Sequence, residues 1–155
     1  MGRIKYSDMK NIEYNHIIGA FKDFFNRHLQ VNQCMEAQTW DYQAGENIYP
    51  AVVIVPTMSN IYQGEMQLNF EIYFIDILLA DNSNGRDVYN DTLEIVKDFV
   101  SYFTHNSELK WSLTEECTVE PLWERFDDIC AGWVLSCNVI VPYGKGTCEI
   151  PLNIE

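Results

Sequence analysis

Apolar residues follow two different spacings along this chain, and together they predict two helices and five main strands. Spacings of three to four residues, which place side chains on one face of a helix, recur over residues 8–29 and 86–104. Alternating or unbroken apolar positions, typical of strands, fill the remaining segments. The expected strands cover residues 31–38, 49–55, 65–79, 118–123 and 129–141. This order, α-β-β-β-α-β-β, predicts an α+β fold in which two helices flank a mixed, mainly antiparallel sheet.

The first expected helix carries a strongly aromatic stripe. Ser7 or Asp8 can cap its first turn. Its apolar face consists of residues at helical spacing, namely Tyr14, Ile17, Phe21, Phe24, Phe25 and His28. Because aromatic rings bury a large apolar area, we expect this helix to pack against a sheet with its rings in the core.

The segment from Glu65 to Leu79 is the longest expected strand. Its first part alternates apolar and polar residues, whereas beyond Tyr73 both faces become apolar. This change predicts that one end of the strand is covered on both sides, by a helix or by a neighbouring subunit. Asp76 falls on the otherwise apolar face, where a lone buried carboxylate is costly. We therefore expect Asp76 at a rim, in a pair or beside a bulge.

Two prolines mark edges near the end of the chain. Pro121 lies within the expected strand 118–123 and indicates an edge strand or a bulge. Pro151 lies in a final stretch whose alternating apolar residues are Cys148, Ile150, Leu152 and Ile154. We interpret residues 147–155 as a C-terminal strand or arm of a single domain that spans residues 1–155. This segment can cover an edge of its own domain or add to the sheet of a neighbour.

The chain carries 23 acidic and 10 basic residues, which gives a formal net charge of −13. A body this acidic repels a phosphate backbone, so we expect no sequence-specific binding of DNA or RNA. An acidic lumen, by contrast, suits a channel through which DNA must slide without sticking. Residues 1–30 carry a net charge of +2 and residues 31–155 a net charge of −15. This asymmetry indicates either a head-to-tail docking pair or an ordinary solvated helix face.

Residues with catalytic or metal-binding chemistry show no diagnostic spacing in the sequence. The five cysteines include no C-x-x-C pair and lie far from the three histidines, so we interpret them as reduced, buried, small hydrophobic residues. The carboxylate pairs Glu115/Glu116 and Asp127/Asp128 are expected by chance in so acidic a chain, and strand neighbours point to opposite faces. Glycine-rich phosphate loops and hydrolase motifs are absent. We therefore expect no catalytic residue, metal or cofactor, and a protein that is not an enzyme.

Residues 122–126, Leu-Trp-Glu-Arg-Phe, have the composition of a contact surface. Trp123, Arg125 and Phe126 lie at the expected tip of a hairpin, and tryptophan and arginine commonly anchor interfaces. Together with Ile150 and Leu152, they are the interface residues that the sequence predicts. The alternative is that Trp123 and Phe126 close one end of the core while Arg125 is solvated or paired with a neighbouring aspartate.

The C-terminal part of the chain also carries a family resemblance. Pro121-Leu122, Glu124-Arg125-Phe126-Asp127-Asp128, Ala131-Gly132-Trp133 and the Cys148–Pro151 end resemble structural proteins of phages from gut Bacteroidales, including the crAss-like group. A helix, a three-stranded meander, a second helix and a closing strand pair are similar to tail-terminator and head-to-tail neck ring proteins of tailed bacteriophages. The motif likeness covers about a fifth of the chain, and the likeness in element order covers most of it.

This resemblance implies a virion protein that forms a hexameric or dodecameric ring at the neck or tail. Such a ring joins the head to the tail, contacts other neck, portal or tail proteins and conducts DNA as passing cargo. The resemblance implies no cofactor and offers no catalytic residues. We expect the protein in the host cytoplasm during assembly, without a signal peptide or a membrane partner, because no apolar run is long enough to span a bilayer.

Two other function classes remain open at this stage. One is a small α+β enzyme with dispersed catalytic residues, using Asp76 or His105. The other is a monomeric ligand-binding module with an apolar cavity lined by Trp40, Trp111 or Trp133. An enzyme predicts a cleft with perturbed carboxylates, and a ring protein predicts self-association.

Overall fold

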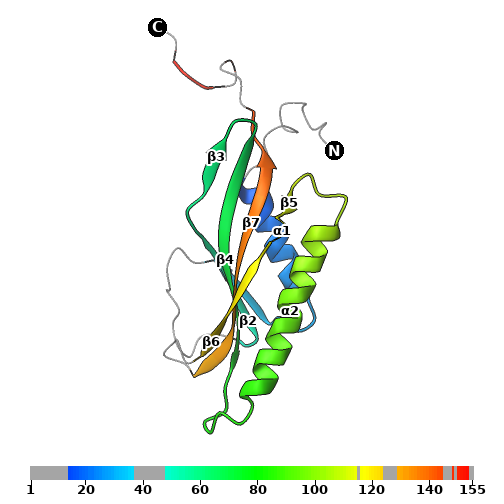
Figure 1. The fold of residues 1–155 in the computed structure, drawn as a ribbon, viewed down its shortest axis with the longest axis vertical. Helices are drawn as coiled ribbons and strands as arrows, with labels where there is room; N and C mark the ends of the chain where they lie inside the picture. The colour runs from blue at the N-terminus through cyan, green and yellow to red at the C-terminus, as the bar shows by residue number, and fades with distance from the viewer. Residues whose placement is uncertain are drawn as a thin grey trace.

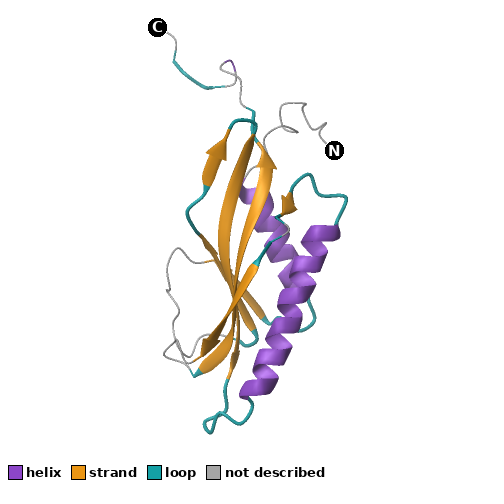
Figure 2. Ribbon diagram, in the orientation of Figure 1, coloured by secondary structure: helices purple, strands orange, loops and turns teal. Residues whose placement is uncertain are grey.

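The computed structural model describes residues 14–36, 48–114, 116–123, 129–144, 148 and 150–153. Within these ranges the chain forms two layers, a twisted sheet and a pair of helices (Figures 1 and 2). The elements are α1 (Tyr14–Arg27), β1 (Gln33–Glu36), β2 (Ala51–Pro56), β3 (Asn60–Tyr62), β4 (Glu65–Ile77), α2 (Gly85–His105), β5 (Ser112–Leu113), β6 (Thr118–Trp123) and β7 (Cys130–Pro142). The expected α+β class, with two helices and a mixed, mostly antiparallel sheet, is confirmed.

The sheet is organised around its two longest strands. The strand order is β1-β2-β4-β7-β5, while β3 pairs with the start of β4 and β6 pairs with the first part of β7. β4 and β7 pair antiparallel along their whole length, from Glu65 opposite Pro142 to Ile77 opposite Cys130. At about 3.3 Å per residue, these 13-residue strands extend for about 40 Å. We refer below to the Tyr62 end of the sheet, where β3 turns into β4, and to the opposite Ile77 end.

The first strands do not form the expected meander. β1 and β2 run parallel, with Gln33 opposite Ala51. Parallel neighbours need a crossover of a dozen or more residues, and residues 37–50 provide that length. The structure also places the short strand β3 at residues 60–62, where the sequence indicated only a turn. The loop before β3 is held to β4 by Asn69, whose Nδ2 donates to the carbonyl oxygen of Met58 at 2.7 Å.

The core between the helices and the sheet is built from aromatic rings, as the stripe on the first helix predicted. Phe21 and Phe25 of α1 are fully buried and meet Phe99 of α2 at ring-centroid distances of 5.0 and 5.1 Å. Phe74 of β4 lies below them, 5.6 Å from Phe25. The contacts among these rings therefore fix the positions of α1 and α2 on this face of the sheet.

The other face of the sheet, which we call the helix-free face, is apolar at only one end. Ala51, Tyr73, Ile75 and Val134 belong to a buried cluster there, which confirms the predicted two-sided burial beyond Tyr73. Toward the Tyr62 end the same face presents polar residues, namely Glu65, Gln67, Asn69 and Glu71 of β4 and Ser136 and Asn138 of β7.

The C-terminal segment is not part of the sheet. Residues 148 and 150–153 are outside any strand, and Ile150 and Leu152 are 41% and 71% exposed. In Figure 1 they lie beyond the end of β7, away from the helices. The predicted cap at Ser7 or Asp8 lies outside the described residues.

Candidate functional site

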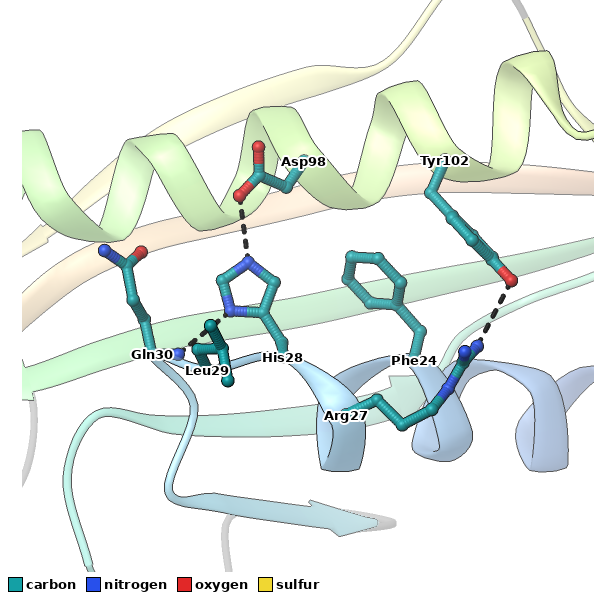
Figure 3. A pocket seen from close by; sticks show the side chains of 7 residues that line it. All are labelled: Phe24, Arg27, His28, Leu29, Gln30, Asp98 and Tyr102. Atoms are coloured by element: carbon teal, nitrogen blue, oxygen red, sulfur yellow. Dashed lines mark hydrogen bonds and ion pairs between the residues drawn. The ribbon is translucent and has the colours of Figure 1, made fainter.

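An open groove of about 560 Å³ lies between the end of α1 and the C-terminal half of α2 (Figure 3). Its lining residues are Phe24, Arg27, His28, Leu29, Gln30, Asp98 and Tyr102. Leu29, two residues beyond the end of α1, is 99% exposed. The groove therefore combines an apolar surface with several hydrogen-bonding side chains at its rim.

A histidine–carboxylate pair holds the two helices together at this groove. Nε2 of His28 lies 2.9 Å from Oδ2 of Asp98, and Nδ1 of His28 accepts a hydrogen bond from the backbone nitrogen of Gln30 at 3.2 Å. Because Nδ1 accepts, the ring proton of the neutral imidazole sits on Nε2 and is donated to Asp98. Both ring nitrogens are thus engaged, and the pair positions the helices instead of presenting a free base.

Arg27 forms the opposite rim of the groove. Its Nη2 donates to the hydroxyl of Tyr102 at 3.3 Å and lies 2.9 Å from Oδ2 of Asp23. Beside it, the rings of Phe24 and Tyr102 meet at a centroid distance of 5.0 Å. Both of these Arg27 contacts use Nη2, so the remaining guanidinium N–H groups can bind an acceptor that enters the groove. The arrangement suits binding of an apolar side chain and a nearby carbonyl or carboxylate.

The predicted interface residues are spread over different parts of the structure. Trp123 is 41% exposed and stacks on Tyr89 of α2 at 5.7 Å. Its ring lies directly over Gly85, where a Cβ atom would come within 2.5 Å of it. Trp123 therefore covers the start of α2 with one part of its ring, and the rest of the ring is exposed to solvent. Arg125 and Phe126 lie outside the described residues, and Ile150 and Leu152 lie in the C-terminal segment.

The candidate catalytic residues of the enzyme alternative do not meet. Asp76 accepts a hydrogen bond from the backbone nitrogen of Ile77, and it lies close enough to Asp91 of α2 for the two charges to repel. Nδ1 of His105 lies 3.1 Å from the carbonyl oxygen of Ser101. Since 14 residues of helix separate positions 91 and 105, Asp76 and His105 are about 20 Å apart along α2.

The expected tryptophan cavity is not assembled from the described tryptophans. Trp111 is buried against Phe103 and Phe21 and lines an open hollow of about 460 Å³. Trp133 packs against Tyr89, near the other end of α2, and Trp40 lies outside the described residues.

The cysteines match the sequence interpretation only in part. Cys130 and Cys137 are buried and Cys34 and Cys117 partly so, whereas Cys148 is exposed. Burial raises the pKa of the Cys34 thiol to about 12, so this thiol stays protonated at neutral pH. Among the described residues, no three histidine, cysteine or acidic side chains gather as metal ligands would.

Charge is divided between the two layers of the fold. All seven strands together contain no lysine or arginine, and their charged residues are Glu36, Glu65, Glu71, Asp76 and Glu120. Every described base lies on a helix or in the loop after α2, namely Lys22, Arg27, Arg86, Lys97 and Lys110. Glu65, Glu71 and Glu120 share the helix-free face of the sheet, as their strand register shows. Counting bases per expected strand would have revealed this division from the sequence.

Comparison with protein-family models and with curated proteins finds no match for this chain. None of the described helices has the length and apolar character needed to cross a bilayer.

Asp76 provides a pH-dependence prediction. Partial burial, followed by the charge of Asp91, raises the pKa of Asp76 above its ordinary value of 3.8, and the hydrogen bond from Ile77 opposes this only in part. The folded state therefore binds this proton more tightly than the unfolded state, so the contribution of Asp76 to stability is present at low pH and lost as pH rises above 3.8.

We expect Asp76→Asn to be more stable than the original protein at pH 7, by less than about 1 kcal/mol because Asp76 is only partly buried. At pH 3 the two proteins should unfold at the same urea concentration. Urea titrations at both pH values measure the difference, and Asp81→Asn, at an exposed loop carboxylate whose pKa is lowered, is the control with the opposite sign. A variant destabilised equally at both pH values would contradict the prediction.

Proposed function

We propose that this protein is a structural subunit of a homo-oligomeric ring at the neck or tail of a tailed bacteriophage, with its sheet facing the DNA channel. The observation that carries the proposal is the division of charge: the strands contain carboxylates and no bases, whereas every described base lies on a helix or in the loop after α2, beside six carboxylates. A ring with the sheet inward presents a negative lumen to a negative polymer. Repulsion keeps the DNA centred and mobile, whereas lysines or arginines would hold its phosphates.

Exposed apolar residues support self-association. Four of them lie at the Tyr62 end, namely Met58, Ile61, Tyr62 and Tyr143. Four others lie at the Ile77 end, namely Ile77, Leu79, Trp123 and Ile129. These two patches differ in residues and are separated by the length of β4. Two unlike patches on one subunit favour head-to-tail contacts, which close into rings when the rotation permits.

The family resemblance adds the expected stoichiometry and partners. It implies six or twelve subunits, stacked on a portal or on the last ring of a tail tube. As a subunit of such a ring, the protein joins the phage head to the phage tail and catalyses no reaction.

Native mass spectrometry tests the proposal directly. The protein is measured alone over a range of concentrations and again with portal and tail-tube proteins from the same genome. A closed ring of six or twelve subunits, alone or on one of those partners, supports the proposal. A monomer that binds neither partner overturns the proposal and favours a ligand-binding module.

The orientation of the ring is tested by reversing charge on one layer at a time. Glu65, Glu71 and Glu120 are replaced by lysine in one variant, and Asp87, Asp91 and Glu108 of the helix layer in the control. Both variants change the net charge from −13 to −7. Rings of the sheet variant should retain short duplex DNA at low salt, and retention should fall steeply as salt rises.

Rings of the helix-layer control should retain clearly less DNA, because their new lysines face away from the channel. DNA binding is measured by filter retention at several salt concentrations, after native mass spectrometry has shown that both variants still form rings. Equal retention by the two variants would mean that the sheet does not face the channel.

A further inference from the structure

We infer that the C-terminal segment of one subunit, residues 148–153, docks into the α1–α2 groove of the next subunit, with Ile150 and Leu152 as its apolar anchors. We call this segment the arm. The inference rests on the proposed ring and deepens it, because it names the contact that links neighbouring copies.

The arm has the features of a segment that is covered by a partner. Leu152 is 71% exposed and Ile150 is 41% exposed, although both are large apolar residues. The backbone nitrogen of Leu152 donates to the carbonyl oxygen of Ile150 at 2.8 Å, which closes a tight local turn at Pro151. In Figure 1 the described part of the arm points away from its own sheet and helices. A projecting segment outside the sheet can reach a second copy without unfolding its own domain.

Charge favours one layer of the second copy as the acceptor of the arm. Residues 146–155 contain Glu149 and Glu155 and no base. The sheet layer carries only carboxylates, so it repels this segment. The helices and the loop after α2 hold all five described bases, Arg27 at the groove among them, beside six acidic residues, so this layer repels the arm less than the sheet does.

Within the helix layer, the groove offers matching chemistry. Leu29 is almost fully exposed at its edge, and Phe24 and Tyr102 provide an aromatic wall. A volume of about 560 Å³ is large enough for two aliphatic side chains. Asp98 is paired with His28 and Asp23 with Arg27, so each carboxylate near the groove already has a donor. The remaining N–H groups of Arg27 can then bind a carbonyl or carboxylate of the arm.

The positions of the arm and the groove also fit a head-to-tail contact. The arm leaves the domain at the Tyr62 end, where Tyr143 bonds to Gly64. α1 ends toward the opposite end of the sheet, where the backbone nitrogen of Asn32 donates to the carbonyl oxygen of Pro50 at 2.9 Å. The groove lies on the side of the helix layer and away from the Tyr62 end, so the arm of one copy and the groove of the next are two unlike surfaces, as a head-to-tail contact requires.

Crosslinking between two distinguishable chains tests the contact. One chain carries Gln30→Cys and Cys148→Ser with a size tag, and the other is the original protein, whose Cys148 is exposed. Gln30 lies at the groove and is itself exposed. A short bismaleimide should link the tagged and untagged chains, and mass spectrometry should locate the link between positions 30 and 148.

In the matched control, the new cysteine is placed at a different exposed position, outside the groove. Ser107→Cys places an exposed cysteine in the loop after α2 and outside the groove. We expect at least about tenfold less crosslinked product from this control, because docking raises the effective concentration of the two thiols into the millimolar range. Replacing Cys148 by serine in the untagged chain should abolish the product.

A second pair of variants tests the anchors without altering the groove. Leu152→Asp should remove the crosslink and weaken the ring in native mass spectrometry, whereas the neighbouring Asn153→Asp adds the same charge and should do neither. A ring that forms without the 30–148 link and tolerates Leu152→Asp would overturn arm docking and leave the ring proposal standing. A protein that forms no ring under any condition would overturn both.

Discussion

Replacing Gly132 by alanine is expected to destabilise the protein by about 4 kcal/mol or more, the largest effect of any single substitution proposed here. Gly132 lies in β7 with φ +156°, a backbone conformation that residues with a side chain rarely adopt. A Cβ atom at this position would collide with the backbone carbonyl of Phe74 in β4. Because the backbone of β7 fixes the position of this Cβ atom and the carbonyl belongs to the backbone of β4, neither can move without breaking the β4–β7 ladder.

Urea unfolding monitored by circular dichroism measures this loss, and Gly19→Ala is the matched control. Gly19 lies in α1, and a Cβ atom added there would have no neighbour within 4 Å, so alanine should stabilise the helix by about 0.5–1 kcal/mol. Two glycine-to-alanine changes in one protein should therefore have opposite signs. A Gly132→Ala protein of unchanged stability would show that β7 can shift relative to β4.

The second large effect is expected at Phe99. Its ring is fully buried, stacks on Phe25 with an interplanar angle of 7° and lies 4.8 Å from the ring of Phe103. It also contacts Phe74 of the sheet, at 6.3 Å. Phe99→Ala removes an α2 ring that contacts both α1 and the sheet, and should cost about 3–5 kcal/mol in the free energy of unfolding. Calorimetry or urea titration provides the measurement.

Phe99→Leu serves as the graded control. Leucine fills part of the cavity, so it should lower the free energy of unfolding clearly less than alanine does. The alanine substitution should also loosen the helices at the groove, because Phe99 lies between Asp98 and Tyr102 on α2. If alanine and leucine gave the same small loss, the aromatic cluster would be looser than its ring distances indicate.

The sequence predicted those parts of the fold that depend on local periodicity. The aromatic stripe of α1, the two-sided burial beyond Tyr73 and the edge position of β6, which contains Pro121, are all confirmed. The parallel pairing of β1 with β2 was missed, because pairing direction depends on the path of residues 37–50 and not on the alternation within either strand. β3 was missed because three exposed residues carry no periodic signal.

The candidate site was harder to predict for a related reason. His28 and Asp98 are 70 residues apart in sequence, and only the packing of α1 on α2 brings them to 2.9 Å. No spacing rule connects two positions on separate helices. The separation of bases from strands, by contrast, was present in the composition of each segment. Of the predicted interface residues, Ile150 and Leu152 enter the docking proposal, and the role of Trp123 as an interface residue stays a prediction.

The position of β7 in the sheet has a consequence for how the protein is made. β7 lies between β4 on one side and β5 and β6 on the other, yet it follows all of them in the chain. Until residues 130–142 leave the ribosome, β4 lacks its principal partner, and the edge of β4 that pairs with β7 stays available to chaperones or to other nascent chains. Long-range pairing of this kind slows folding and raises the risk of aggregation. The yield of native protein should therefore depend on how quickly synthesis continues past Pro142.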